Sequence, residues 1–332
     1  YWKGILSHDL EPNRPYAEMS RTAHELEKIG PHLVGLKIHN DVAILWSRDS
    51  ANAIGFMPFT SSGPQWSFAG PTADCSSLVQ QIHRSLYDLN VGSDFVFPET
   101  KDFSAYKLLI VPALYISDDA LLQRISDYVK NGGHVVMTFK SGFANENSAV
   151  RWVRAPGPLR EAAGFSYQEF SNLEHPLALK DDPFHVGVAG TNANQVSYWA
   201  EFLMPEHAKA LAYYDHPFFG KWPAITENQF GSGTLLYEGT YLSAALQTAV
   251  LKQAVEKAGL AGPDQLQPAA VHVTHGVNRM GKRVHYYFNY SSAEVKANYA
   301  FGSGTNLLDG KPVSKADPLA LAPWDLAIVE EK

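Results

Sequence analysis

Three glutamates stand near the ends of predicted strands, where a carboxylate could act as an acid or a nucleophile. They are Glu201, Glu227 and Glu238. Enzymes that cleave glycosidic bonds with retention hold two carboxylates about 5 to 5.5 Å apart. The spacing of these three residues does not fix such a geometry, so we expect each to hydrogen-bond in a loop or at the surface. We therefore predict no catalytic carboxylate in this chain.

One cysteine and one serine are candidate nucleophiles. Cys75 lies at the start of a predicted helix, whose N-terminus can lower a thiol pKa. Ser141 follows the strand predicted over 134–139, where a sheet of the class I glutamine amidotransferase type carries its cysteine on a sharp turn. The turn here is Lys-Ser-Gly, without a cysteine, and no His-x-Glu pair follows Cys75 at a suitable spacing. We expect structural roles for both, and an amidotransferase-like hydrolase using Cys75 stays an alternative.

The thirteen histidines form no metal-binding pattern. His272 and His275 are three residues apart in a predicted strand, which places them on opposite faces. His185, His207 and His216 are scattered. No glycine-rich dinucleotide fingerprint and no Walker sequence occurs. The sequence therefore predicts neither a metal site nor a cofactor.

Tryptophans could stack on sugar rings if they were exposed. For each of them we favour packing in a core or between subunits, because tryptophan is enriched at protein interfaces. A carbohydrate-binding module made of the C-terminal strands stays open as an alternative. The candidates are Trp66, Trp152, Trp199, Trp222 and Trp324.

The composition is that of a packed globular protein. Hydrophobic residues make up 45% and charged residues 18% of the chain, which argues against disorder and against a coiled coil. The formal net charge of -7 argues against nucleic-acid binding, which needs a basic face. No apolar run approaches the roughly 18 residues of a membrane helix. A single cysteine excludes an intrachain disulfide and is compatible with a reducing compartment such as the cytoplasm.

Short apolar runs that alternate with amphipathic helices predict a parallel sheet covered on both faces. The helix predicted over 75–89 carries a single apolar stripe, and the segment 107–139 has the length of a right-handed crossover unit. We therefore expect a doubly wound α/β sheet. Its strands are predicted at 42–47, 93–98, 107–114, 134–139 and 233–239.

The chain is longer than a usual single core, so two domains are expected. Residues 145–230 are rich in proline and aromatics, and their strands are predicted to be antiparallel. A Gly-Pro-Asp turn marks a boundary near residue 263. Beyond it, strands separated by the turn signals Asn278 to Gly281 and Asp309-Gly310 predict a small antiparallel β-sandwich.

The first thirty residues predict one helix that follows the end of another domain. Asn13 suits the N-cap position and Pro15 the first helical turn. The Trp-Lys-Gly-Ile-Leu run before them is expected to be the last segment of a preceding domain. The helix carries a stripe that we expect to be buried, formed by Tyr16, Met19, Ala23, Leu26 and Ile29.

Six stretches spread over nearly the whole chain are specific in combination. They are YWKGILSHDLEPN, LKIHNDVAILWS, LYDLNVGSDFVFP, YKLLIVPALYISDDALLQRISDYVKNGGHVVMTFKSG, AYYDHPFFGKWPAITENQFGSGTLLYEGTYLS and VHVTHGVNRMGKRVHYYFNYSS. Together they resemble the part of a family 42 glycoside hydrolase, a β-galactosidase, that follows its catalytic barrel.

The resemblance implies three parts. Residues 1–30 would be the tail of the catalytic barrel and a linker helix, 31–262 a Rossmann-like trimerisation domain related in fold to the class I glutamine amidotransferases, and 263–332 a C-terminal β domain. It implies a homotrimer whose β-galactoside substrate binds in the barrel. The family's two catalytic glutamates belong to that barrel, which takes roughly 250 residues and has no room here. We therefore expect an inactive assembly part of a retaining β-galactosidase, and we assign no catalytic, cofactor-binding or metal-binding residue.

Overall fold

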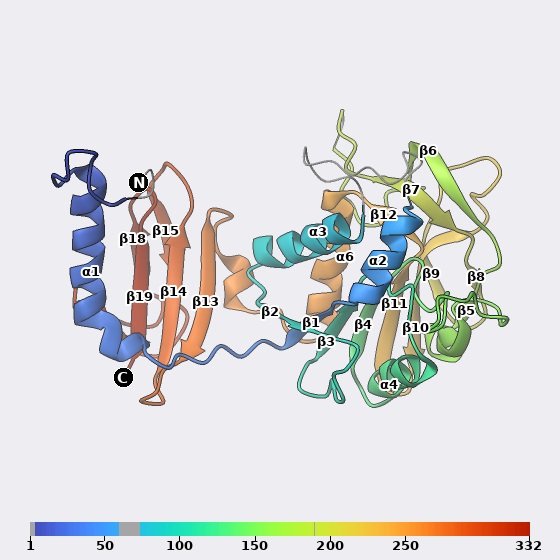
Figure 1. Cartoon of the computed structure of the whole chain (residues 1–332), viewed down its shortest axis with the longest axis horizontal. Coiled ribbons are helices and arrows are strands. Elements are labelled where there is room, and N and C mark those ends of the chain that lie inside the picture. The colour runs from blue at the N-terminus through green and yellow to red at the C-terminus, as the bar shows by residue number, and fades with distance from the viewer. Residues whose placement is uncertain (1–3, 60–73, 189) are drawn as a thin grey trace. The chain divides into compact units, whose positions relative to one another are not determined.

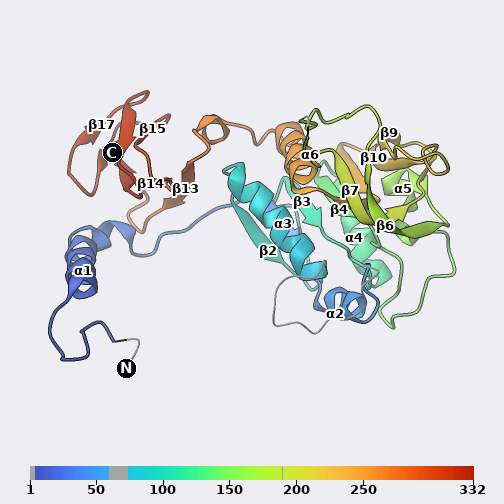
Figure 2. The ribbon, with the colours of Figure 1, turned by 90° about the horizontal axis from the view of Figure 1, so that it is seen from above.

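The computed structural model describes residues 4–59, 74–188 and 190–332. The chain divides into two compact units (Figures 1 and 2). The larger unit spans Asn40–Gly262, and the smaller one joins the residues up to His39 to Pro263–Lys332. Each unit has hydrophobic cores of its own.

A seven-stranded sheet forms the centre of the larger unit. Five neighbouring strands run parallel, and two antiparallel strands extend the sheet at one edge. Every residue of β1 and β3 is buried because helices cover both faces, so the α/β sheet predicted from the apolar runs is confirmed in this mixed form. In spatial order the strands are β2 (Ser93–Val96), β1 (Val42–Leu45), β3 (Leu108–Val111), β4 (His134–Thr138), β11 (Gly233–Glu238), β10 (Pro223–Phe230) and β9 (Lys209–Tyr213).

Helices pack on both faces of this sheet. In Figure 1, α3 and α6 lie on one side and α4 on the other, and their apolar side chains belong to two separate cores. The Asp118 side chain caps α4 by accepting from the N–H of Leu121 at 2.7 Å. The short helix α2 was not predicted, because only Ile54 among its apolar residues is buried. The helices are α2 (Arg48–Phe56), α3 (Cys75–Asp88), α4 (Asp119–Lys130), η1 (Gly157–Leu159), α5 (Arg160–Ala163) and α6 (Ala244–Lys257).

A second, three-stranded sheet lies at the carboxyl ends of the parallel strands. Its strand β12 follows β11 after a single glycine, and β7 pairs with β12 in antiparallel fashion. The backbone N–H of Glu201 donates to the carbonyl of Gly239 at 2.8 Å, which places the end of β7 beside the end of β11. The strands are β12 (Thr240–Leu242), β7 (Gln195–Glu201) and β6 (Phe170–Ala178), and β5 (Phe165–Ser166) pairs separately with β8 (Met204–Pro205).

The smaller unit contains two antiparallel sheets around one core, which confirms the predicted antiparallel β domain. Tyr287 and Tyr299 are fully buried at its centre. The five-stranded sheet has β13 (Val271–Val277), β14 (Arg283–Asn289), β19 (Leu326–Glu331), β16 (Gly304–Asn306) and β17 (Pro312–Val313). The two-stranded sheet has β15 (Val295–Asn298) and β18 (Pro318–Leu321), and the turn η2 (Pro263–Leu266) precedes them.

Helix α1 (Arg14–Leu33) packs on this β domain through its last turns only. The Asn13 side chain accepts from the N–H of Tyr16 at 3.1 Å, as predicted for an N-cap. Ile29 is buried in a core with Val284, Leu307 and Ile328. The rest of the predicted stripe is exposed, so the expectation of a fully buried stripe is wrong for the described chain. None of the described helices combines the length and apolarity needed to cross a membrane.

Candidate functional site

Open α/β sheets bind ligands at the carboxyl ends of their parallel strands, and in the larger unit this edge is filled by protein side chains. After β4 the chain turns sharply at Lys140, whose φ is 63°. The Lys140 backbone N–H donates to Glu201 Oε1 at 2.7 Å. Since Glu201 comes from β7 and is buried, the small sheet inserts a carboxylate at the turn.

Both oxygens of Glu201 are hydrogen-bonded. Oε1 also accepts from Trp199 Nε1 at 3.2 Å, and Oε2 accepts from the Tyr237 hydroxyl at 2.8 Å. Burial raises the pKa of Glu201 to about 6, and these hydrogen bonds act in the opposite direction. Three donors on one carboxylate give Glu201 a structural role at the junction of the two sheets.

The Lys140 ammonium is held by aromatic rings. Its Nζ lies 3.8 Å from the centroid of the Trp199 ring and 5.6 Å from that of Tyr115. Such cation–π contacts stabilise an ammonium that has lost water. Burial nevertheless lowers the pKa of Lys140 to about 8, with the charge of Glu201 acting against this shift.

The three candidate glutamates occupy separate places. Tyr237 and Glu238 are consecutive in β11 and point to opposite faces, so Glu238 lies on the other side of β11 from Glu201. Glu238 Oε1 accepts from Gln247 Nε2 at 2.9 Å, and burial raises the pKa of Glu238 to about 8. Glu227, on β10, pairs with Lys257. Within the part of the chain that the structure describes, no two of these carboxylates share a hydrogen-bond partner.

Neither candidate nucleophile has the surroundings of one. Cys75 is buried in the first turn of α3, where burial first and the Asp74 charge second raise its thiol pKa to about 12. Asp74 also occupies the helix N-terminus, accepting from the N–H of Ser77 at 2.8 Å. The Ser141 hydroxyl donates to the carbonyl of Thr138 at 2.7 Å and accepts from the N–H of Leu114 at 3.0 Å. Ser141 therefore supports the turn after β4.

A chain of four titratable groups crosses the β13–β14 hairpin of the smaller unit. His275 Nε2 lies 2.7 Å from Asp264 Oδ2, and the Nδ1 atoms of His275 and His285 are 2.8 Å apart. His285 Nε2 lies 2.9 Å from Glu331 Oε1. Sequence reasoning considered His275 but missed His285. Counting outward from the predicted turn at Asn278 would have paired the two, because they stand opposite each other in the hairpin register.

The other candidate histidines lie in separate loops. His216 Nδ1 accepts from the N–H groups of Phe218 and Phe219, at 3.1 and 3.3 Å. His185 and His207 are exposed and stand elsewhere in the larger unit. Among the described residues, no three His, Cys, Asp or Glu side chains are arranged to hold a metal ion.

The tryptophans differ widely in exposure. Trp199 is buried and stacks on Phe170 with ring centroids 4.6 Å apart, and Trp222 stacks on Phe202 at 5.0 Å. Trp152 and Trp324 are exposed. Trp66 lies outside the described residues.

Residues 40–261 match the family model of the β-galactosidase trimerisation domain, and residues 271–331 match that of the β-galactosidase C-terminal domain. The chain belongs to this β-galactosidase family. A β-galactosidase of Clostridium cellulovorans, BgaA, is 27% identical over 338 residues, which cover 99% of this chain and 47% of that protein. BgaB of a Geobacillus species is 30% identical over 247 residues, covering 74% of this chain and 34% of that protein.

The fold is also that of solved β-galactosidases. The enzyme from Bacillus circulans sp. alkalophilus superposes with a TM-score of 0.84 at 24% identity, covering 99% of this chain and 47% of that one. The chain thus spans about half the length of the β-galactosidases that it matches. Within its described residues, the strands form no eight-stranded parallel barrel.

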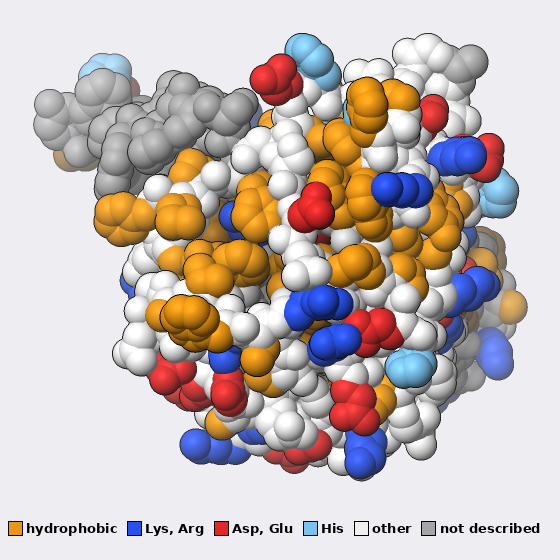
Figure 3. All heavy atoms as spheres, turned by 90° about the vertical axis from the view of Figure 1, so that its right-hand side faces the viewer, with side chains coloured by type: hydrophobic (Ala, Val, Ile, Leu, Met, Phe, Trp, Pro, Cys, Tyr) orange, Lys and Arg blue, Asp and Glu red, His pale blue; other side chains and the backbone are white. Residues whose placement is uncertain are grey.

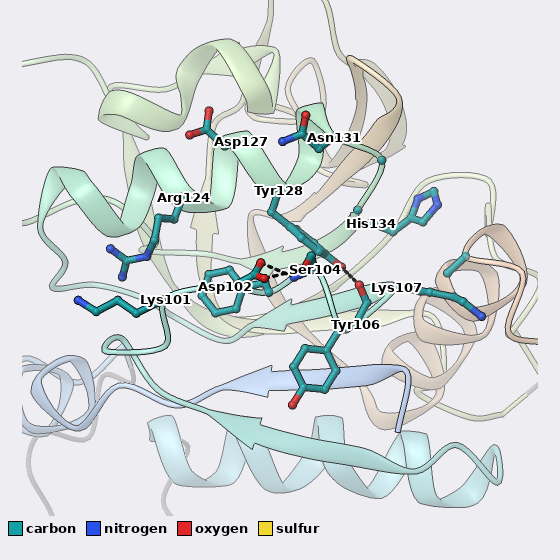
Figure 4. A pocket seen from close by; sticks show the side chains of 14 residues that line it. Lys101, Asp102, Ser104, Tyr106, Lys107, Arg124, Asp127, Tyr128, Asn131 and His134 are labelled. Atoms are coloured by element: carbon teal, nitrogen blue, oxygen red, sulfur yellow. Dashed lines mark hydrogen bonds between the residues drawn. The ribbon is translucent and has the colours of Figure 1, made fainter. Parts of the chain in front are cut away.

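The larger unit also has a pocket of about 600 Å³ at the amino ends of β3 and β4 (Figure 4). Several of its polar groups are hydrogen-bonded within the protein. Ser104 Oγ donates to Asp102 at 2.7 Å, and the Tyr128 hydroxyl donates to the carbonyl of Tyr106 at 3.0 Å. His134 Nδ1 lies 2.8 Å from the Thr234 hydroxyl. The pocket is at the end of the sheet opposite to the usual ligand-binding edge.

Proposed function

We propose that this chain is the assembly part of a retaining β-galactosidase, in which the larger unit joins three copies and a catalytic barrel elsewhere in the protein hydrolyses terminal β-D-galactosides. The observation that carries the proposal is the match of residues 40–261 to a β-galactosidase trimerisation domain. The names of the relatives, all β-galactosidases of about twice the length of this chain, support the activity of the whole protein.

The arrangement of the charged groups supports the proposal that this part of the protein does not itself catalyse hydrolysis. Retention requires two carboxylates close together, whereas Glu201, Glu227 and Glu238 are each bound to different partners. The carboxyl edge of the large sheet, where a ligand would be expected, holds Glu201 and the Lys140 side chain instead.

We further propose that the larger unit is a Rossmann-like sheet of the class I glutamine amidotransferase type. Strand order supports this, because the chain starts at β1, moves outward to β2 and then reverses to β3 and β4. The sharp turn with positive φ at Lys140 also stands where such folds carry their nucleophile.

The proposed division has a lead-in over 1–30, a trimerisation domain over 31–262 and a C-terminal β domain over 263–332. The family matches at 40–261 and 271–331 support the last two. In the compact units, the residues up to His39 group with the C-terminal strands, so α1 is physically part of the β domain.

Two measurements on the 332-residue chain test the proposal. Light scattering is expected to give three times the 36.6 kDa chain mass. Hydrolysis of nitrophenyl β-D-galactoside is expected to stay at the level of a mock preparation. A monomer at every concentration contradicts the assembly role. Hydrolysis well above that of the mock preparation contradicts the proposal that this chain is not itself catalytic.

A further inference from the structure

The loop between β4 and η1 carries a tryptophan that contacts nothing on its outer side. Trp152 is fully exposed, and its neighbours Val150 and Val153 are 54% and 60% exposed. A fully exposed tryptophan is rare in a folded chain because so much apolar surface stays in water. We name residues 150–154 the Trp152 ridge.

The backbone beneath this ridge is fixed. The N–H of Arg151 donates to the carbonyl of Phe143 at 3.1 Å, and Val150 forms an antiparallel bridge with Ala144. The buried Arg151 guanidinium donates to the carbonyl of Ser117 at 2.5 Å and pairs with Asp119. Because the backbone of the ridge is already ordered, this loop would lose little conformational entropy when a partner covers Trp152.

Two hollows flank the ridge. One, of about 290 Å³, runs between the ridge and Phe143, Tyr167 and Phe170, and the other, of about 480 Å³, borders Asn145 and Pro158. Phe170 is itself 44% exposed. Figure 3 faces the side of the larger unit that carries β5, β6 and β8, and hydrophobic side chains are spread across it. The surface therefore offers a partner one protruding tryptophan and two hollows beside it.

The place of the ridge in the chain indicates the kind of partner. The arginines near the ridge have acidic partners in the same chain, because Arg151 pairs with Asp119 and Arg160 pairs with Glu206. The exposed apolar area of the ridge, rather than its charge, is therefore what a partner would cover. The ridge lies inside the segment that matches a trimerisation domain, so a second copy of this chain is the partner that this place in the chain favours.

We propose that the Trp152 ridge is the anchor by which one copy of this chain binds the next. This inference rests on the proposed assembly function and names the surface that performs it. In a closed ring of three, each interface is head-to-tail, so the ridge of one copy meets a different surface on its neighbour. Tryptophan and arginine are the residues that most often dominate the energy of such contacts.

Trp152→Ala is the decisive variant, and Trp324→Ala is its matched control. Trp324 is 68% exposed but belongs to the smaller unit, outside the trimerisation match. Sedimentation velocity over a concentration series is expected to give at least a tenfold higher dissociation constant for Trp152→Ala and no change for Trp324→Ala. Circular dichroism should be unchanged in both, since neither side chain is buried.

The outcomes separate the ridge from the assembly function. If the unaltered chain assembles and Trp152→Ala assembles equally well, the ridge is not the interface, while the assembly function stands. This result is also expected if the ridge instead packs on another part of its own polypeptide. If Trp324→Ala weakens assembly as much as Trp152→Ala, the ridge has no special role. If the unaltered chain stays monomeric, both the ridge and the assembly function of this chain are contradicted.

Discussion

The ring nitrogens Nδ1 of His275 and His285 face each other at 2.8 Å, and each ring's Nε2 faces a carboxylate. Three contacts among these four groups require three protons to become hydrogen bonds, whereas two neutral imidazoles carry two. One ring must therefore be charged for all three to form. Burial of His285, which stacks on Phe301 with centroids 4.1 Å apart, lowers its pKa. His285 is thus expected to be the neutral ring of the pair.

This proton count predicts how the smaller unit responds to acid. One more proton would charge both rings, so that each Nδ1 carries a hydrogen and the two N–H groups face each other. The lowered pKa of His285 means that the unfolded chain binds this proton at higher pH than the folded one. The stability contributed by His285 is therefore full above about pH 6.5, the unfolded value, and is lost as the pH falls through the folded pKa.

Nitrogen-15 NMR of the histidine rings between pH 5 and 8 checks this prediction. His285 should appear at pH 7 as the neutral ring with its proton on Nε2. Thermal unfolding of His285→Gln should depend less on pH between 5 and 7 than that of the unaltered chain, with His216→Gln of the larger unit as the control. A charged His285 ring at pH 7 contradicts the assignment.

Replacement of Glu238 by glutamine should stabilise the larger unit in alkaline solution. Because burial raises the pKa of Glu238 to about 8, its contribution is full below the unfolded value of 4.5 and is lost as the pH rises through 8. The loss reaches at most about 5 kcal/mol well above pH 8. Glu238→Gln keeps the shape without the charge.

Thermal unfolding at pH 6 and pH 9 measures this effect. We expect Glu238→Gln to gain stability over the unaltered chain, and the gain to be larger at pH 9 than at pH 6, because the loss caused by the carboxylate grows from pH 4.5 to about 8. Glu227→Gln, at a more exposed ion pair, is the control and should show no such gain. A variant less stable at both pH values would mean that the carboxylate is required beside Gln247.

Cys75 should resist alkylation in the folded protein. With its pKa raised to about 12, almost no thiolate exists at pH 8, and the side chain is buried. Iodoacetamide followed by mass spectrometry should show labelling after unfolding in urea and very little before. Rapid labelling of the folded chain, together with loss of a glutaminase or amidase activity, would revive the amidotransferase-like alternative.

Truncation of Ile29 should destabilise the contact of α1 with the β domain. Ile29 packs against Val284, Leu307 and Ile328, so Ile29→Ala is expected to cost about 2 to 4 kcal/mol of unfolding free energy. Leu26→Ala on the same helix is the control, because Leu26 is 52% exposed and should change stability by less than about 0.5 kcal/mol. Urea unfolding measures both. Equal effects of the two substitutions would contradict the packing.

The local pattern of apolar residues was sufficient to predict some elements of the structure and insufficient to predict others. The apolar runs of β3 and β11 could be recognised because every residue of these strands is buried. The contact of Lys140 with Glu201 could not, since it joins residues 61 positions apart through a small sheet whose strands are interrupted by prolines and irregular segments. The apolar stripe of α1 predicted the helix correctly but predicted buried side chains that are in fact exposed. Periodicity indicates that a helix has an apolar face and does not indicate what covers that face.

The hydrogen bond from the Lys140 backbone to Glu201 has a consequence for protein engineering. On an elbow of this kind, a backbone N–H near the nucleophile position would be wanted for stabilising an oxyanion, but here the Glu201 carboxylate already accepts the N–H of Lys140. Placing a cysteine or serine at position 140 would therefore install a nucleophile next to a negative charge and beneath the small sheet. Converting this scaffold into a hydrolase would have to begin with β7, at Glu201 and Trp199, and only then turn to the elbow itself.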